Sequence, residues 1–172
     1  MKPHILYTSQ FASPIGSMTA IADEEALLFL DFSDSQELKN YHQFNLKELV
    51  EEKSTTPLRM IEKEMQLYFQ GKQIEFRTPI KMFGSSFKKQ VWHALQKIPF
   101  GKTCSYSDIA CRMNHPKATR AVGNANKMNP LVIIIPCHRV ICHNHTLGGY
   151  RGGIMRKKWL LNHESHDKNK VI

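Results

Sequence analysis

The chain of 172 residues lacks any apolar run approaching the roughly 20 residues that a membrane-spanning helix needs. It also lacks the pattern of a secretory signal peptide, because MKPHILYTSQ holds no long apolar stretch and no small-residue cleavage site. Cysteine is absent from residues 1–84, and all 4 cysteines lie in the second half. We therefore expect an intracellular protein whose thiols serve as core residues, metal ligands or nucleophiles rather than as disulfides.

Acidic residues are scarce in the second half of the chain. Residues 85–172 hold 3 acidic and 15 basic side chains, whereas residues 1–84 hold 12 and 9, so the excess of +9 comes entirely from the second half. A basic domain beside a mildly acidic one favours a polyanionic partner, most simply nucleic acid, over a surface that is basic only for solubility. The composition changes near Gly84, which predicts one domain over residues 1–84 and another over 85–172.

The first domain shows strand patterns followed by a helix pattern and no group that suggests chemistry. Strands are predicted over residues 5–8, 17–22 and 26–32, the last two forming a hairpin. Thr56 and Pro57 predict a helix start, and Gly71 predicts its end. We interpret this half as a scaffold.

The second domain contains two consecutive helix patterns separated by a short break. Ser105 and Asp108 form a capping-box pattern for a helix reaching Met113, after a helix predicted over 87–98. A further helix is predicted to begin near Lys117. At about 100° per residue, one face of it is apolar and the other polar. The predicted inward residues are Ala118, Ala121, Val122 and Ala125, and the predicted outward residues are Arg120, Asn124 and Lys127. This helix-turn-helix pattern favours DNA binding over an ordinary helical hairpin.

A continuous apolar run at residues 131–135 predicts a buried strand that stops at Pro136. A thiol, Cys137, and an imidazole, His138, follow directly. The imidazole can share a proton with the thiol directly or through a water molecule if Pro136 makes a turn, since neighbouring residues on a strand point to opposite faces. A Cys-His pair alone is most often a packing feature, but its setting in the basic half favours a nucleophile.

Three other clusters have less specific interpretations. Residues 142–145, with the sequence CHNH, could be a metal site but fit a loop between strands better. Residues 156–158, with the sequence RKK, could be a targeting signal but fit a solvated or phosphate-facing helix surface better. Cys104 and Cys111 are predicted to be packing residues.

The sequence around the thiol resembles the O6-alkylguanine-DNA alkyltransferases, also called methylated-DNA–protein-cysteine methyltransferases. The resemblance covers nearly the whole second half, whereas Ser13-Pro14-Ile15-Gly16 is its best point in the first. Its motifs in the second half are Pro136-Cys137-His138-Arg139-Val140-Ile141, Phe100-Gly101, Ser105-Tyr106, residues 117–123, Asn129-Pro130, Gly149-Tyr150 and residues 158–164.

The resemblance implies an α+β protein with a small sheet-plus-helix, ribonuclease H-like domain and a helical domain carrying a winged-helix-like helix-turn-helix. It implies minor-groove binding, extrusion of the damaged nucleotide and irreversible, stoichiometric transfer of an alkyl group from O6-alkylguanine, or O4-alkylthymine, to Cys137. His138 would act as base, oriented by Glu164. Asn129 would hold the turn that carries the thiol, and Tyr106 would donate a hydrogen bond to the leaving guanine.

The resemblance also implies contacts with DNA and with the base. Arg120 would fill the gap in the duplex and Ala121 would let the helix approach the groove floor. The remaining implied DNA contacts are Thr119, Gly123, Asn124 and Lys127, and the implied pocket residues are Val140, Tyr150, Arg151 and Gly152, with backbone groups of Cys137, Val140 and Arg151 reading the guanine edge.

Three departures from the family pattern matter. Some members bind structural zinc in the N-terminal half, but without cysteine there we expect no metal, and no cofactor elsewhere. Gly152 stands where several bacterial relatives carry tryptophan, which suggests a roomier pocket. Asn124 stands where relatives often have a small residue. We expect a monomer that acts on double-stranded DNA in the bacterial cytoplasm or nucleoid. A lesion sensor without alkyl transfer and a cysteine hydrolase that turns over are the alternatives.

Overall fold

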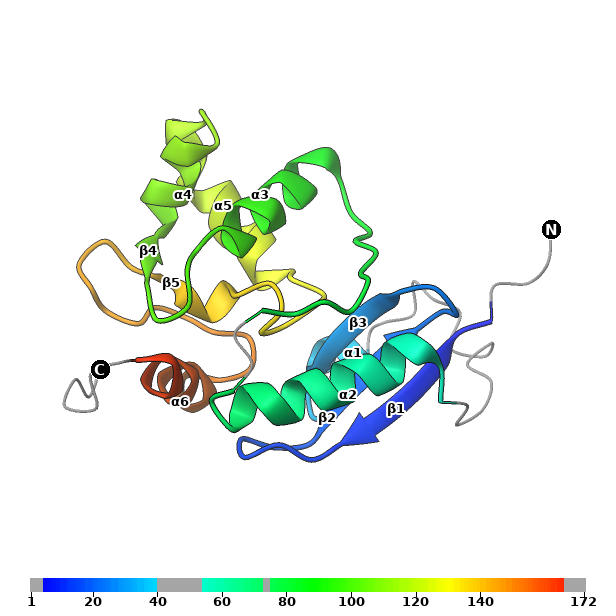
Figure 1. The fold of residues 1–172 in the computed structure, drawn as a ribbon. Helices are drawn as coiled ribbons and strands as arrows, with labels where there is room; N and C mark the ends of the chain where they lie inside the picture. The colour runs from blue at the N-terminus through cyan, green and yellow to red at the C-terminus, as the bar shows by residue number, and fades with distance from the viewer. Residues whose placement is uncertain (1–4, 40–53, 73–74, 166–172) are drawn as a thin grey trace. The chain divides into compact units, whose positions relative to one another are not determined.

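The computed structural model describes residues 5–39, 54–72 and 75–165. Its contacts divide the chain into two units, Met1–Met82 and Phe83–Ile172. The first is a small sheet with helices and the second is mostly helical, so the predicted α+β class is confirmed (Figure 1). None of the helices in the described ranges combines the length and the apolar character needed to cross a membrane.

The first unit contains a three-stranded antiparallel sheet in the order β1-β2-β3. The predicted hairpin is present, and its turn is fixed by Asp23 Oδ1, which accepts from the backbone N–H groups of Glu25 and Ala26 at 2.8 and 2.7 Å. The first strand begins and ends later than predicted, because its pairing with β2 rather than its apolar character sets its limits. The elements are β1 (Tyr7–Phe11), β2 (Met18–Ala22), β3 (Leu27–Phe32), α1 (Gln36–Lys39) and α2 (Thr56–Phe69).

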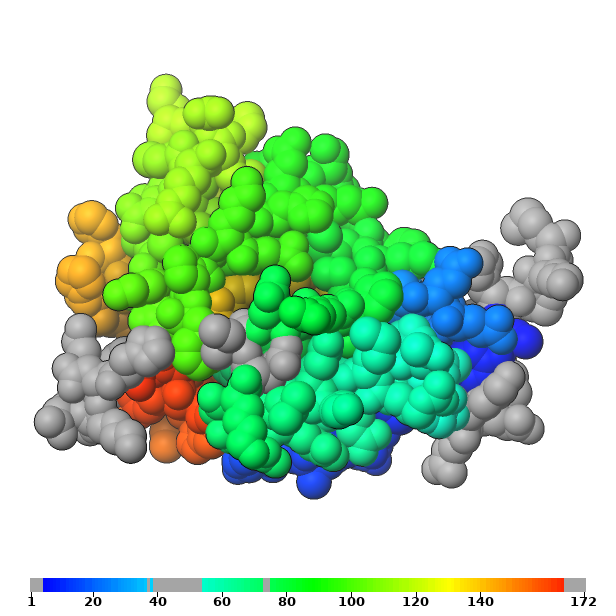
Figure 2. Space-filling view, viewed as in Figure 1, coloured from blue at the N-terminus to red at the C-terminus, as the bar shows by residue number. Residues whose placement is uncertain are grey.

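Helix α2 packs its apolar stripe toward the sheet, with Leu58, Ile61 and Met65 buried as the helical spacing requires. Its start differs slightly from the prediction, since Thr55 rather than Thr56 is the N-cap residue. Its end is as predicted: Gly71 has φ +72° and donates its N–H to Tyr68 O at 2.8 Å. Figure 2 shows part of the outer side of α2 on the face in view.

The second unit packs α3, α4 and α5 against one another. The indole of Trp92 on α3 donates to Ala125 O on α5 at 2.9 Å, so a buried polar contact fixes the two helices together. Both helices of the predicted helix-turn-helix, α4 and α5, are present. The elements are α3 (Ser86–Gln96), β4 (Cys104–Ser105), α4 (Tyr106–Arg112), η2 (Pro116–Ala118), α5 (Thr119–Lys127), η3 (Cys137–Arg139), β5 (Val140–Ile141) and α6 (Ile154–Glu164).

A short parallel pair joins the start of α4 to the chain that follows the thiol. Cys104 pairs with Val140 and Ser105 with Ile141. The predicted capping box is present: Asp108 N donates to Ser105 Oγ at 3.1 Å and Ser105 N donates to Asp108 Oδ2 at 2.9 Å. The pair and the cap together place Tyr106, the first residue of α4, beside the end of the segment that carries Cys137.

Candidate active site

The apolar run at residues 131–135 is buried except for the half-buried Ile134, but it is not a strand, so that prediction was wrong. Ile133 has φ +73°, and the chain folds back so that Ile135 N donates to Leu131 O at 2.9 Å. Asn129 holds this turn in place of a strand ladder. Its Oδ1 accepts from Leu131 N at 2.9 Å, and its Nδ2 donates to Ile135 O at 2.7 Å.

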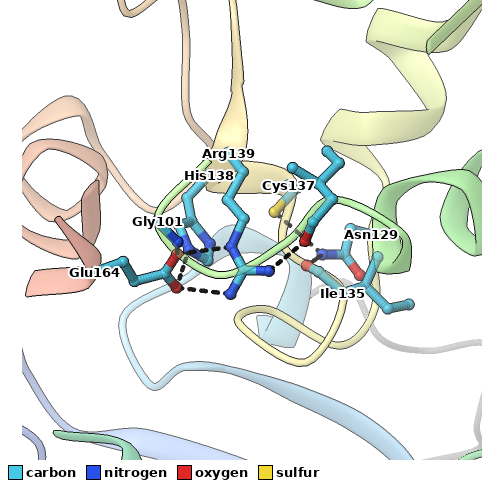
Figure 3. A network of polar contacts seen from close by, with 8 residues as sticks. Gly101, Asn129, Ile135, Cys137, His138, Arg139 and Glu164 are labelled. Carbon is cyan, nitrogen blue, oxygen red and sulfur yellow. Dashed lines mark hydrogen bonds and ion pairs between the residues drawn. The ribbon is translucent and has the colours of Figure 1, made fainter. Parts of the chain in front are cut away.

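The same Asn129 amide reaches the thiol, since Nδ2 lies 3.1 Å from Cys137 Sγ (Figure 3). Pro136 leads into a single 3₁₀ turn over Cys137–Arg139, so the turn expected from the proline is present. Cys137 is only 4% exposed. A thiol held in this way by a rigid amide has one orientation, and it faces the pocket described next.

A pocket of about 340 Å³ opens beside Cys137. It brings together residues from α4, from α5, from the thiol turn and from the loop before α6. Its lining includes these predicted site residues: Tyr106, Gly123, Lys127, Asn129, Cys137, Tyr150 and Arg151. Val140 and Gly152 do not line it, and Asn126, Val132 and Gly149 line it without having been predicted.

Behind the thiol lies a buried network of charged and polar groups (Figure 3). His138 Nε2 lies 2.8 Å from Glu164 Oε1, and both side chains are at most 1% exposed. Arg139 donates to the same carboxylate through Nε at 2.6 Å and Nη2 at 3.0 Å, and through Nη1 to Ile98 O at 2.7 Å. Gly101 N also donates to Glu164, at 3.4 Å.

The network fixes the protonation of its members. Burial opposes ionisation of Glu164, but the hydrogen bonds and charges of His138 and Arg139 outweigh it and hold the pKa of that carboxyl far below its usual range. Burial lowers the pKa of His138, and Glu164 offsets this only in part. An ionised carboxylate only accepts hydrogen bonds, so Nε2 of a neutral His138 carries the proton and Nδ1 is left as an acceptor. Nδ1 has no hydrogen-bond partner within the described part of the chain.

Lys157 is fully buried, so the prediction of a solvated surface for residues 156–158 was wrong at this position. Its Nζ donates to the carbonyls of Val140 at 2.6 Å, Leu147 and Gly149 at 3.4 Å. Burial lowers the pKa of Lys157 from 10.5 to about 8, against the opposing charges of Cys137 and Cys142. The ammonium therefore ties β5, directly after the thiol turn, to the loop that lines the pocket.

Tyr106 lines the pocket next to Gly123 of α5, where an added Cβ would lie 3.9 Å from the tyrosine ring. Burial is the main cause that raises the pKa of Tyr106, with the thiols of Cys142 and Cys137 adding to it. Its hydroxyl is thus protonated at neutral pH and able to donate a hydrogen bond into the pocket.

Helix α5 presents a polar face to solvent next to this pocket. Arg120, Asn124 and Lys127 are exposed, as the helical spacing predicted. Ala121 was predicted to lie inward on that spacing and is exposed instead, and the buried residues of α5 are Val122, Ala125 and Asn126. Thr119 is half-buried at the first turn.

Within the described ranges, the remaining cysteines and histidines form no ligand set. Residues 142–145 lie in a loop after β5, and across the described ranges no three His, Cys, Asp or Glu side chains gather as they would around a metal ion. Cys104 is buried as predicted, but Cys111 is exposed, so its prediction as a packing residue was wrong.

Sequence reasoning missed Arg139, Lys157 and Asn126. Arg139 lies inside the motif that revealed the thiol, but a motif does not show which carboxylate its guanidinium will meet. Lys157 was hidden in a basic run. Asn126 falls at the edge of the apolar face of α5 at about 100° per residue, which was the available signal.

Comparisons with known proteins agree with this geometry. Family models match residues 6–82, as the ribonuclease-like domain of 6-O-methylguanine DNA methyltransferase, and residues 86–166, as its DNA binding domain. The methylated-DNA–protein-cysteine methyltransferase of Methanosarcina acetivorans is 38% identical over 156 residues, which cover 91% of this chain and 96% of that protein. The constitutive methylated-DNA–protein-cysteine methyltransferase of Bacillus subtilis is 39% identical over 161 residues, covering 92% and 94%.

Solved structures give the same result. The crystal structure of the Mycobacterium tuberculosis O6-methylguanine methyltransferase has a TM-score of 0.82 at 35% identity and covers 93% of each chain. That of a Mycobacterium tuberculosis OGT in complex with DNA has a TM-score of 0.81 at 33% identity, covering 94% of this chain and 97% of that one. The resemblance seen in the sequence is confirmed: the chain belongs to the methylated-DNA–protein-cysteine methyltransferase family.

Proposed function

We propose that this protein repairs DNA by direct reversal, moving the alkyl group of O6-alkylguanine in duplex DNA onto Cys137 Sγ. The observation that carries the proposal is the orientation of a buried thiol. Asn129 directs Cys137 at a pocket beside α5, while His138 and Glu164 stand behind it. This arrangement suits a nucleophile that meets a base extruded from DNA.

The proton of the thiol passes to His138 Nδ1, directly or through one water molecule. Glu164 then stabilises the imidazolium through Nε2–H. The thiolate attacks the alkyl carbon, the bond from that carbon to O6 breaks, and its electron pair stays on the base. Tyr106 donates a hydrogen bond to the departing guanine, which takes up a proton at N1 from water, and the His138 imidazolium returns its proton to water. The thiol itself accepts the group, so the reaction requires no cofactor.

The product is a thioether, which has no bond that water readily cleaves. Each molecule therefore reacts once, and the protein acts as a stoichiometric reagent. The exposed side chains of Arg120, Asn124 and Lys127 supply the contacts to DNA, Ala121 leaves room for close approach, and Thr119 and Gly123 lie at the same surface. Action as a monomer in the bacterial cytoplasm is part of the same proposal.

The resemblance assigns Val140, Arg151 and Gly152 to the pocket, but Val140 and Gly152 do not line it. Arg151 lines the pocket and donates from Nη1 to Lys127 O at 3.1 Å, which links the pocket loop to the end of α5. Gly152 accepts from Arg156 Nη1 at 3.1 Å through its carbonyl. Gly152 itself does not line the pocket, so its missing side chain is no evidence of room for bulkier adducts.

The test is intact-mass and peptide-mapping analysis after mixing the protein with duplex DNA containing O6-methylguanine. We expect one added methyl group on Cys137, saturating at one per molecule and absent in Cys137→Ser. Cys111→Ser removes an exposed thiol from the same unit and retains the reaction. Tight binding to the lesion without a mass change would favour a sensor, and repeated turnover would favour a hydrolase.

A further inference from the structure

The pocket loop, residues 147–153, forms one wall of the pocket and contains neither helix nor strand. It supplies Tyr150 and Arg151 to the lining. Gly148 and Gly153 lie near its two ends with φ of +63° and +91°, values that favour glycine. Because no ladder of backbone hydrogen bonds holds such a segment, its position depends on the contacts that it makes with neighbouring elements.

Two basic side chains bind this loop to its neighbours. Lys157 donates to two carbonyls in the first half of the loop and to Val140 O, which ties that half to β5. The second half is bound by Arg151, whose Nη1 donates to Lys127 O at 3.1 Å. Lys127 is the last residue of α5, so the loop is joined to β5 at one point and to α5 at another.

The acceptor of the Arg151 hydrogen bond is a carbonyl at the end of a helix. The last carbonyls of an α-helix have no partner within the helix, and a cation is favourable at this end of the helix dipole. The guanidinium of Arg151 therefore satisfies the end of α5 and joins it to the pocket loop. The resemblance gives a role only to the backbone of Arg151, so this side-chain contact is additional to it.

Helix α5 carries the exposed polar side chains that the proposed function places on DNA, whereas the pocket loop carries Tyr150 beside the thiol. A bond between them fixes the pocket wall relative to the helix that contacts DNA. We propose that Arg151 is a positioning residue, whose guanidinium holds the pocket loop against α5 while Cys137 reacts. Its effect on methyl transfer rests on the proposed function.

The test compares Arg151→Met with the wild type in single-turnover methylation of Cys137. Two methyl donors are used: a duplex containing O6-methylguanine, and the free base O6-methylguanine, which has no sugar-phosphate chain for a guanidinium to bind. The maximal rate constant should fall by about 2- to 10-fold with both donors, the range expected for the loss of one ordinary hydrogen bond. Amide hydrogen exchange of residues 147–153 in the free protein should become faster by a similar factor. Arg151→Lys, which keeps a donor, should restore part of each effect.

Two variants serve as matched controls. Arg112→Met removes an exposed arginine from α4 in the same unit and should leave both maximal rate constants and the loop exchange at their wild-type values. Lys127→Met removes an exposed cation but keeps the backbone carbonyl that accepts from Arg151. It should weaken binding of the duplex and leave the exchange of the loop unchanged.

Slower transfer to Arg151→Met from the duplex alone, with unchanged loop exchange, would mean that Arg151 binds DNA and would overturn the inference. Unchanged rate constants with both donors would also overturn it, while methylation of the wild type would still support the proposed function. No methyl transfer to the wild type from either donor would overturn the proposed function, and the loop exchange of Arg151→Met would still show whether the guanidinium holds the loop.

Discussion

Lys157→Met removes the buried charge that ties the thiol turn to the pocket loop. The ammonium donates to the carbonyls of Val140, Leu147 and Gly149 and is shielded from solvent. Methionine has a similar length but offers no donor, so the three carbonyls lose a common partner. We expect slower methyl transfer, because the loop that carries Tyr150 is no longer held against the thiol turn.

The pKa gives the size and the sign of a pH effect on stability. The pKa of Lys157 falls from 10.5 in the unfolded chain to about 8 in the folded one, which corresponds to a cost of roughly 3 kcal/mol for burying the charge. Between these values the unfolded chain binds more protons, so stability rises with pH. From pH 7 to 9.5 the free energy of unfolding should rise by about 2 kcal/mol more in the wild type than in Lys157→Met.

The assay is urea unfolding of both proteins at the two pH values, followed by tryptophan fluorescence. Both tryptophans, Trp92 and Trp159, lie in the second unit, so the signal reports on the unit that contains Lys157. Comparison with the variant cancels the titration of groups that both proteins share. Equal pH dependence in the two proteins would refute the reasoning, because it would mean that Lys157 carries no cost of buried charge.

Three further changes test the site. Glu164→Gln should slow methyl transfer by about 100-fold in single-turnover assays, and an unchanged rate would count against the base role of His138. The stabilisation that ionised Glu164 gives to the fold is complete above pH 4.5 and is lost as the pH falls toward its lowered pKa. Acid unfolding curves of the variant should therefore lack that loss of stability. Asn129→Ala should lower the free energy of unfolding by about 1–3 kcal/mol and slow methyl transfer, as measured by urea unfolding and by mass analysis. Methyl transfer at the wild-type rate would show that the contact to Sγ does not orient the thiol. Arg120→Ala should weaken duplex binding and, because it removes one cation, reduce the slope of log affinity against log salt by about 1. Fluorescence anisotropy measures both, and an unchanged slope would show that the charge of Arg120 does not act on the duplex.

Local patterns predicted most of the helices and the hairpin, since their causes lie within a few residues. Ser105 and Asp108 form their capping box through groups three positions apart, and Pro136 produces its turn through its own fixed backbone angle. The segment over residues 131–135 shows where this reasoning stops. Its composition is that of a strand, but one side chain, Asn129, replaces the strand hydrogen bonds with its own amide. Composition does not show that a side-chain amide will take the place of strand hydrogen bonds.

Long-range partners explain the other errors. Lys157 has basic neighbours on both sides in the sequence, yet it alone is buried, because the segments after the thiol supply carbonyls that satisfy it. Arg139 and Glu164 are 25 residues apart and meet only through the fold. Ala121 was assigned inward because it is small and apolar, but a small side chain can equally lie on an exposed face where another molecule must approach.

In the proposed mechanism, the buried ion pair is what lets a histidine shielded from solvent serve as a base. His138 and Arg139 both hydrogen-bond to Glu164, and together they keep the carboxylate ionised even though burial opposes this. An ionised Glu164 fixes the proton of neutral His138 on Nε2, so the free electron pair lies on Nδ1. Loss of Arg139 would remove two of these hydrogen bonds and a positive charge, which would weaken the stabilisation of the ionised carboxylate that fixes the tautomer. In that mechanism the guanidinium acts on the thiol through two intervening side chains, Glu164 and His138.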